Sequence, residues 1–132
     1  VGKRKDNPGN KWQMPQGGID ENEDYLDAAK RELEEETSIT NIKLIKELEG
    51  FQTYLLPQNL LGIIWRGKYK GQIQKWFCMR FLGNDNEINI KTKKPEFLEW
   101  KWINLEDITK NVVDFKLDVY NEVKKKVLDI LK

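Results

Sequence analysis

"QGGIDENEDYLDAAKRELEEETSI", residues 16–39, is the stretch of this 132-residue chain that decides the fold. It opens on two adjacent glycines, Gly17 and Gly18, which are typical of a loop with tight backbone geometry. Apolar residues then recur at helical spacing, so the pattern predicts a helix from about Asp24 to Thr37. Four glutamates crowd the end of this helix: Glu32, Glu34, Glu35 and Glu36. The stretch therefore predicts a glycine loop followed by a helix with an acidic end.

Three of these glutamates converge on one face of the predicted helix. At about 100° per residue, Glu32, Glu35 and Glu36 point in similar directions, whereas Glu34 points to solvent. Like charges three or four residues apart each cost about 0.2–0.5 kcal/mol. We expect no lysine or arginine four residues before or after these glutamates to relieve this repulsion. A solvated acidic face is the simpler interpretation, but it leaves the crowding beside the predicted core unexplained, and a bound divalent cation explains it.

The residue types that are absent limit the chemistry of such a site. The chain has no histidine, which excludes serine–histidine and cysteine–histidine nucleophiles, histidine phosphotransfer and histidine-ligated zinc. Cys78 is its one cysteine, and its apolar surroundings indicate a packing residue rather than a nucleophile. Carboxylate oxygens are hard ligands, so the predicted cation is Mg²⁺ or Mn²⁺.

Composition indicates one globular domain without a strong overall charge. Hydrophobic residues make up 39% of the chain and charged residues 34%, with a formal net charge of +1. Any attraction to a polyanion must therefore be local. No run approaches the ~18 apolar residues that a membrane span requires, so we expect a cytoplasmic protein that does not bind membranes.

The rest of the chain predicts strands and a final helix. Runs at 42–48, 51–56 and 61–67 read as strands, and 72–82 reads as a buried central strand because it is almost continuously apolar and aromatic. A further strand is predicted at 97–105, with Asn104 capping a short helix. Residues with helical spacing then predict a last helix with a core-facing stripe: Phe115, Val119, Val123, Val127, Ile130 and Leu131. Together these elements predict an α/β fold with a mixed sheet.

The spacing of residues 17–39 resembles the Nudix box, the loop–helix signature of hydrolases that act on nucleoside diphosphates linked to another group. Gly17 is followed after five residues by Glu23, and after seven more by the run from Arg31 to Glu36. One position differs, because the family has glycine where this chain has Ser38. Glycine suits the left-handed residue that ends such a helix, so serine there should cost about 1 kcal/mol.

The resemblance extends over nearly the whole chain. "WQMPQGGID", "GQIQKWF", "KKPEFLEWKW" and "DFKLDVY" are similar to the Nudix branch that contains bacterial RNA pyrophosphohydrolases and dinucleoside polyphosphate hydrolases. This resemblance implies an α/β/α sandwich with a mixed central sheet, formed by one domain over residues 1–132. It also implies that the family's first strand precedes the point where this sequence begins.

The resemblance implies a metal site and a brace beside it. Glu32, Glu35 and Glu36 match metal ligands, helped by a backbone carbonyl of the glycine turn, which we assign to Gly18. Glu96 matches a distal glutamate that joins the metal shell or accepts the proton. The resemblance implies Mg²⁺ or Mn²⁺, with more than one ion. Two further positions, Glu23 and Arg31, match residues that brace the loop against the helix.

Substrate-binding residues are also implied by the resemblance. Tyr54 and Lys75 match positions that contact the phosphate chain, although Tyr54 also fits an ordinary strand tyrosine. Arg4 and Phe115 match residues that hold the first base, and Phe115 equally fits the core stripe of the last helix. Lys116 matches a residue that contacts 5′ phosphates, and we expect it to be exposed.

The expected activity is metal-dependent hydrolysis of the 5′-triphosphate or diphosphate end of RNA to a 5′-monophosphate. The alternative substrate is a dinucleoside polyphosphate such as diadenosine tetraphosphate, because the same branch acts on it. A non-catalytic sensor is a hypothesis of another class, but it should lack some of the box carboxylates, and this chain keeps all of them. We expect a monomer, and an accessory protein is a further possible partner.

Overall fold

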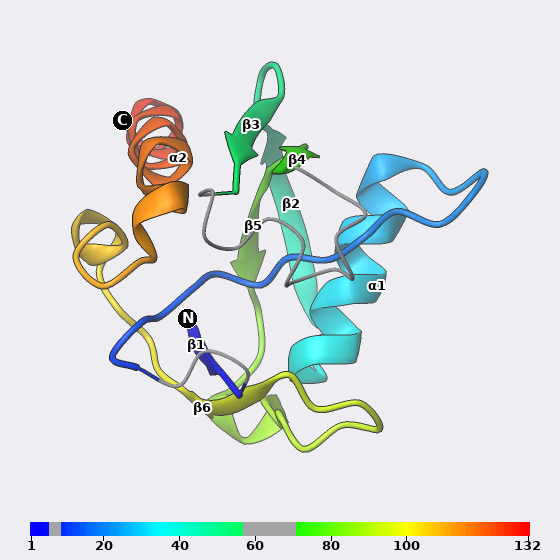
Figure 1. Ribbon diagram of the computed structural model, residues 1–132. Helices are drawn as coiled ribbons and strands as arrows, with labels where there is room; N and C mark the ends of the chain where they lie inside the picture. Colours follow the sequence, from blue (N-terminus) through cyan, green and yellow to red (C-terminus); the bar gives the residue numbers. More distant parts are fainter. Residues whose placement is uncertain (6–8, 57–70) are drawn as a thin grey trace.

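The computed structural model describes residues 1–5, 9–56 and 71–132 (Figure 1). Its longer elements, in chain order, are β1 Gly2–Arg4, α1 Tyr25–Thr37, β2 Ile42–Glu47, β3 Gln52–Leu55, β4 Gly71–Gln74, β5 Phe77–Phe81, β6 Phe97–Trp100 and α2 Leu117–Ile130. Short 3-10 helices span Asp85–Glu87, Leu105–Asp107 and Asp114–Lys116. The strand predicted at 61–67 lies outside the described residues.

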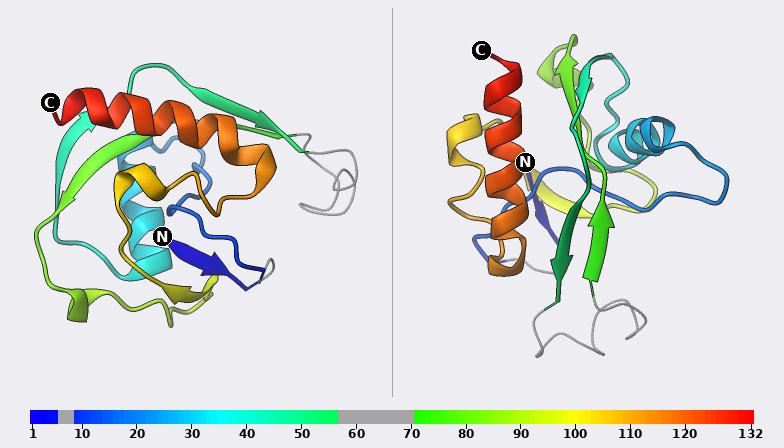
Figure 2. Two further views of the ribbon diagram at one scale, coloured as in Figure 1. Left: turned by 90° about the vertical axis from the view of Figure 1, so that its left-hand side faces the viewer. Right: turned by 90° about the horizontal axis from the view of Figure 1, so that it is seen from above.

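The strands lie between the two helices. The right-hand view of Figure 2 shows α2 on one side of the strands and α1 on the other, which confirms the expected α/β/α layering. The described strands form three antiparallel pairs, β1–β6, β2–β5 and β3–β4. The mixed pairing that we expected is therefore wrong for the part of the chain that the structure covers.

The long strand predicted at 72–82 is also wrong, because the chain breaks between β4 and β5. Gln72 and Gln74 of β4 pair with β3, whereas Phe77 to Phe81 pair with β2. The segment is not fully buried either, since the Ile73 side chain is 73% exposed. Polar residues at 72, 74 and 75 interrupt the apolar run, and the two glutamines hydrogen-bond within a polar cluster described below. The strand predicted at 97–105 likewise ends early, at Trp100.

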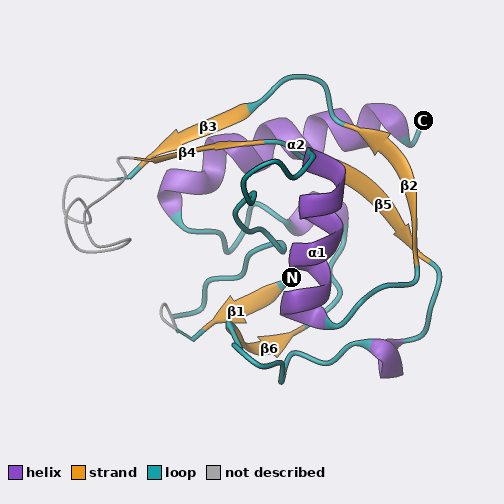
Figure 3. Ribbon diagram, turned by 90° about the vertical axis from the view of Figure 1, so that its right-hand side faces the viewer, coloured by secondary structure: helices purple, strands orange, loops and turns teal. Residues whose placement is uncertain are grey.

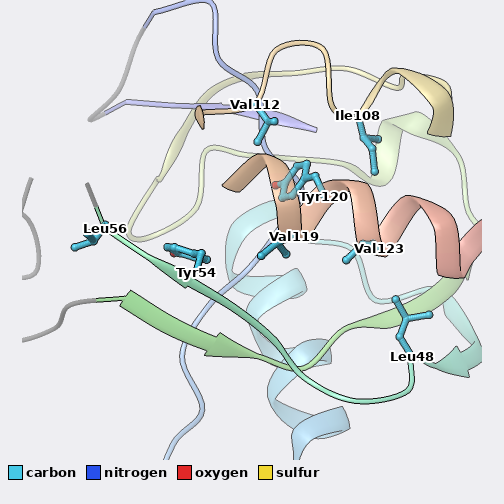
Figure 4. Packing of buried hydrophobic residues seen from close by; sticks show 8 residues of the cluster. All are labelled: Leu48, Tyr54, Leu56, Ile108, Val112, Val119, Tyr120 and Val123. Carbon is cyan, nitrogen blue, oxygen red and sulfur yellow. The ribbon is translucent and has the colours of Figure 1, made fainter. Parts of the chain in front are cut away.

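The core is built around α2, with Leu48, Tyr54 and Leu56 on the side of β3 and with Ile108 and Val112 on the other side (Figure 4). Its buried members are Leu48, Tyr54, Leu56, Ile108, Val112, Val119, Tyr120 and Val123. Tyr120 is 1% exposed, and its hydroxyl accepts a hydrogen bond of 2.8 Å from the Met14 amide. Of the predicted stripe, Leu131 is wrong, because α2 ends before it and its side chain is 55% exposed. Cys78 packs against this core, as predicted.

Helix α1 begins and ends where the sequence predicts. The Asp24 carboxylate accepts a hydrogen bond of 2.8 Å from the Asp27 amide, which caps the first turn. At the other end Ser38 takes the left-handed conformation, with φ 67°, and its amide donates to the Glu34 carbonyl at 2.8 Å. The Ser38 hydroxyl also donates to the Asn89 carbonyl at 2.8 Å. In the described part of the chain no helix is both long and apolar enough to cross a membrane.

Two opposing contributions at Ser38 lead to a stability prediction. Ser38→Gly removes left-handed strain of about 1 kcal/mol but also removes a hydrogen bond of similar value. We therefore expect the free energy of unfolding to change by less than about 0.5 kcal/mol. Ser38→Ala keeps the strain and loses the bond, so it should be less stable by about 1 kcal/mol. Urea unfolding of the two variants measures this difference, and equal stabilities would contradict it.

Candidate active site

Glu36 is the buried carboxylate at the centre of the site. It lies in the last turn of α1 and is 3% exposed. Its Oε2 accepts a hydrogen bond of 3.2 Å from the Gln16 amide, and its Oε1 is buried without a hydrogen-bond partner in the described structure. Burial, followed by the charges of Glu96 and Glu32, raises the pKa of Glu36 to about 8. The protein therefore holds a buried acceptor that would gain free energy from a cation.

Arg31 partly neutralises the other acids, which corrects the expectation that no cation lies four residues from any of them. Its Nη1 donates to Glu32 at 2.8 Å and to Glu35, four residues on, at 3.2 Å. Its Nε donates to Glu23 at 2.8 Å, and its Nη2 donates to the Gly18 carbonyl at 2.7 Å. Hydrogen bonding to Arg31 is the main reason that the pKa of Glu23 falls to about 2. These contacts tie the loop to the helix, in the bracing arrangement that the resemblance implies.

Three carboxylates of the predicted site lie near one another. The charge of Glu96 raises the pKa of both Glu32 and Glu36, although burial is the larger cause for each. Glu35 lies at the outer edge, with a side chain 57% exposed. Within the described residues no three acids are grouped tightly enough to hold a metal ion as they stand. The donors nevertheless fit a hard cation, because all are carboxylates and one buried oxygen of Glu36 is unpartnered.

The glycine turn lies directly against these acids through Gly17. A Cβ added at Gly17 would come within 2.0 Å of the Glu32 carboxylate, so a side chain there would displace that carboxylate from its present position. A Cβ added at Gly18 would meet nothing within 4 Å. The carbonyl of Gly18, our predicted metal ligand, accepts the hydrogen bond from Arg31. Gly17 is therefore the glycine whose missing side chain shapes the site.

The first strand brings a cation to the same region. Arg4 ends β1, which pairs with β6, and its Nη1 lies 3.3 Å from Oε2 of Glu96. The positive charge of Arg4 opposes the rise in the pKa of Glu36. Arg4, predicted to hold the first base, thus lies beside the predicted catalytic acids.

A cluster of side-chain amides adjoins the acids. Gln16, whose amide contacts Glu36, donates from Nε2 to Oε1 of Gln72 at 3.3 Å. Gln74 donates to Oε1 of Gln72 at 3.1 Å, and the Tyr54 hydroxyl donates to the same oxygen at 2.9 Å. Tyr54 is 5% exposed and its pKa is raised by burial. The position predicted to contact phosphates is therefore occupied by a tyrosine that also belongs to the core.

Lys116 completes this cluster and corrects a second expectation. It is 6% exposed rather than solvent-exposed, and its Nζ donates to Gln13 at 3.1 Å and to Gln16 at 3.2 Å. The 3-10 helix Asp114–Lys116 turns its side chain inward just before α2. Sequence reasoning did not identify Gln13 or Gln16, because no periodicity marks them.

The remaining predicted substrate residues differ in position. The Phe115 ring lies 5.4 Å from the Tyr54 ring and packs against the core, half-buried. Lys75 is directed elsewhere, since its Nζ donates to the Gly50 carbonyl at 2.9 Å and lies 5.0 Å from the Phe51 ring centroid. The structure thus brings Phe115 near the amide cluster, while the described contacts of Lys75 are with the end of β2 at Glu47 and with the turn before β3.

Comparison with known proteins gives one family and several close relatives. The NUDIX domain family matches residues 1–123. A Pelagibacter ubique protein named RNA pyrophosphohydrolase is 71% identical over 131 residues, covering 99% of this chain and 83% of that protein. A protein of the same name from Roseobacter denitrificans is 48% identical over 122 residues, covering 91% of this chain and 76% of that protein. The structure of E. coli dihydroneopterin triphosphate pyrophosphohydrolase matches with a TM-score of 0.66 and 21% identity, over 92% of this chain and 81% of that chain.

Proposed function

The chain belongs to the NUDIX family, and from that premise we propose that it hydrolyses the 5′-triphosphate or diphosphate end of RNA to a 5′-monophosphate. The relatives named RNA pyrophosphohydrolase, at 71% and 48% identity over most of this chain, support this substrate class. The retained box carboxylates support catalysis rather than sensing alone.

The observation that carries the proposal is the buried, unpartnered oxygen of Glu36 among other carboxylates. We propose that Glu32, Glu35, Glu36 and Glu96 hold Mg²⁺ or Mn²⁺, more than one ion, with the backbone of the glycine turn beside them. A bound divalent cation supplies charge neutralisation on the phosphates and a lower pKa for the attacking water.

The chain's own residues supply the proton acceptor and the grip on the substrate. One of Glu32, Glu35, Glu36 and Glu96 would accept the proton of the attacking water. Arg4, beside Glu96, and Phe115 would hold the first base. Tyr54 would contact the phosphate chain, and Lys116, beside Gln16, would contact the 5′ phosphates. Contact of Lys75 with phosphate would require it to leave the Gly50 carbonyl.

Product analysis tests the proposal directly. The purified chain is incubated with Mg²⁺ and either 5′-triphosphate RNA or diadenosine tetraphosphate, and products are separated by chromatography. We expect 5′-monophosphate RNA as the faster product, with no turnover in excess chelator. Preferential cleavage of diadenosine tetraphosphate would replace RNA by the dinucleotide as the substrate.

Phe115 and Lys116 provide a prediction about substrate choice. Losing one base-stacking platform costs roughly 1–3 kcal/mol, so Phe115→Leu should lower kcat/KM on triphosphate RNA by about five- to a hundredfold. Leucine keeps apolar contact with the core. Lys116→Met retains the aliphatic stem but removes the charge, and it should weaken RNA binding. Because Lys116 is buried, thermal melting of both variants serves as the fold control. If the two variants lost activity on diadenosine tetraphosphate but not on triphosphate RNA, the assignment of RNA as the substrate would be contradicted.

We also propose that the chain acts as a monomer in the cytoplasm, where RNA 5′ ends are available. Sedimentation of the purified protein with and without RNA tests the oligomeric state. An accessory protein that stimulates the reaction would be detected as a rise in turnover when cell extract is added.

A further inference from the structure

Basic residues gather along the β1–β6 pair and the segments next to it. Residues 1–5, 9–12 and 91–102 contain eight of the chain's lysines and arginines: Lys3, Arg4, Lys5, Lys11, Lys91, Lys93, Lys94 and Lys101. The same segments contain only two acids, Glu96 and Glu99. Asp6, which follows Lys5, lies outside the described residues. We call these eight residues the β1–β6 basic surface.

The two acids of these segments are already paired. Glu99 lies opposite Lys3 in the strand register and forms an ion pair of 3.1 Å with it. Glu96 lies 3.3 Å from Arg4. The positive charge of the other six lysines therefore exceeds what the acids of these segments can balance. In a chain whose formal net charge is +1, this is a local concentration of charge.

The basic surface starts at the catalytic acids. The Lys5 amide donates to the Glu96 carbonyl at 2.9 Å, so the segment containing Lys93 and Lys94 meets the end of β1 beside Glu96. Figures 1 and 3 show β1 and β6 side by side at one end of the molecule, and in Figure 3 the pair lies below α1. From there the surface follows the strand pair to Trp12.

At the far end Trp12 lies among lysines. The Nζ of Lys101 is 4.2 Å from the Trp12 ring centroid, and that of Lys3 is 5.0 Å from it. A ring holding ammonium groups in this way fixes their position without cancelling their charge. Basic side chains thus lie at both ends of the strand pair, with Arg4 beside Glu96 and with Lys3 and Lys101 beside Trp12.

We propose that the β1–β6 basic surface binds the phosphodiester backbone of the RNA downstream of its 5′ end. This inference rests on the proposed function, because it assigns the path of the same substrate beyond the reacting phosphates. Lysines that neutralise phosphates increase affinity independently of sequence and make it sensitive to salt. The surface would therefore favour longer RNA over short 5′-triphosphate compounds.

The other lysine-rich face, on α2, does not offer the same arrangement. There Lys124 donates to the Glu106 carbonyl at 3.0 Å, and Lys132 pairs with Asp129 at 3.4 Å. Acids at positions 118, 122 and 129 are interspersed among its lysines. On the β1–β6 side there are only two acids, and both are paired with basic residues of the surface.

The test compares a triphosphate dinucleotide with a longer single-stranded triphosphate RNA. The double variant Lys93→Ala/Lys94→Ala removes two exposed charges without touching the catalytic acids. We expect kcat/KM on the longer RNA to fall severalfold. The slope of log kcat/KM against log salt concentration should become shallower by up to ~1.4, because each lost phosphate contact contributes ~0.7. The dinucleotide should be hydrolysed as by the wild type.

Lys43→Ala/Lys46→Ala is the matched control, because it removes two exposed lysines from β2, a strand of another pair. It should leave both substrates and the salt slope unchanged. Equal loss on the dinucleotide and the longer RNA, or an equal effect of the control, would overturn the inference.

Binding of 5′-hydroxyl RNA separates this inference from the proposed function. Fluorescence anisotropy should show weaker binding by Lys93→Ala/Lys94→Ala than by wild type or control. If wild type hydrolyses no 5′-triphosphate RNA but this order of affinities holds, the proposed function fails while the RNA-binding surface stands. Equal affinities for all three proteins would overturn the surface itself.

Discussion

Glu36→Gln is expected to lower turnover of triphosphate-ended RNA by about 10²- to 10⁴-fold, the usual range for loss of a catalytic acid or base. The amide can still accept the hydrogen bond from the Gln16 amide, so the loop should keep its position. What is lost is the negative charge and the ability to take a proton. Initial rates at saturating Mg²⁺ measure the effect.

Glu34→Gln is the matched control, since it makes the same chemical change two residues away. Glu34 is exposed and lies on the solvent face of α1, as the helical geometry predicts. Its replacement should change turnover by less than about twofold, because a substitution at an exposed position outside the site usually has little effect on the folded structure. A Glu34 variant as inactive as Glu36→Gln would disprove the convergent-face interpretation.

The same Glu36→Gln change should stabilise the protein when divalent cations are absent. Folding raises the pKa of Glu36 from 4.5 to about 8, so between these values the folded state keeps a proton that the unfolded state releases. Wild-type stability should therefore fall as pH rises through this window, by up to about 1.4 kcal/mol per pH unit. Glutamine does not titrate, and the variant avoids this loss. The difference in the free energy of unfolding between the variant and the wild type should grow as pH rises from 4.5 to about 8. Above this pH it should stay constant, on the order of a few kcal/mol.

Thermal melting in chelator at several pH values measures this difference, with Glu34→Gln as the control. Adding Mg²⁺ should raise the wild-type Tm more than that of Glu36→Gln, because the cation relieves the charge that the variant lacks. A stability difference that does not vary with pH would show that Glu36 is not held with a raised pKa.

Local features of this protein could be predicted from its sequence. The start of α1 next to its cap Asp24 and its left-handed end at Ser38 depend on neighbouring residues, and both are confirmed. The exposed position of Glu34 followed from helical geometry alone. The metal and substrate roles of the predicted site residues remain predictions, since neither the fold nor the comparisons test them.

Tertiary structure decided how residues distant in the chain meet. The burial of Lys116 against Gln13 and the break between β4 and β5 were both mispredicted. Periodicity reports which face of one element is apolar, and it carries no information about which polar partners another element presents to it. A lysine whose ammonium finds two glutamine oxygens can be buried, because hydrogen bonds offset its desolvation. Such partners exist only once the glycine loop, the β3–β4 pair and the segment before α2 have packed together.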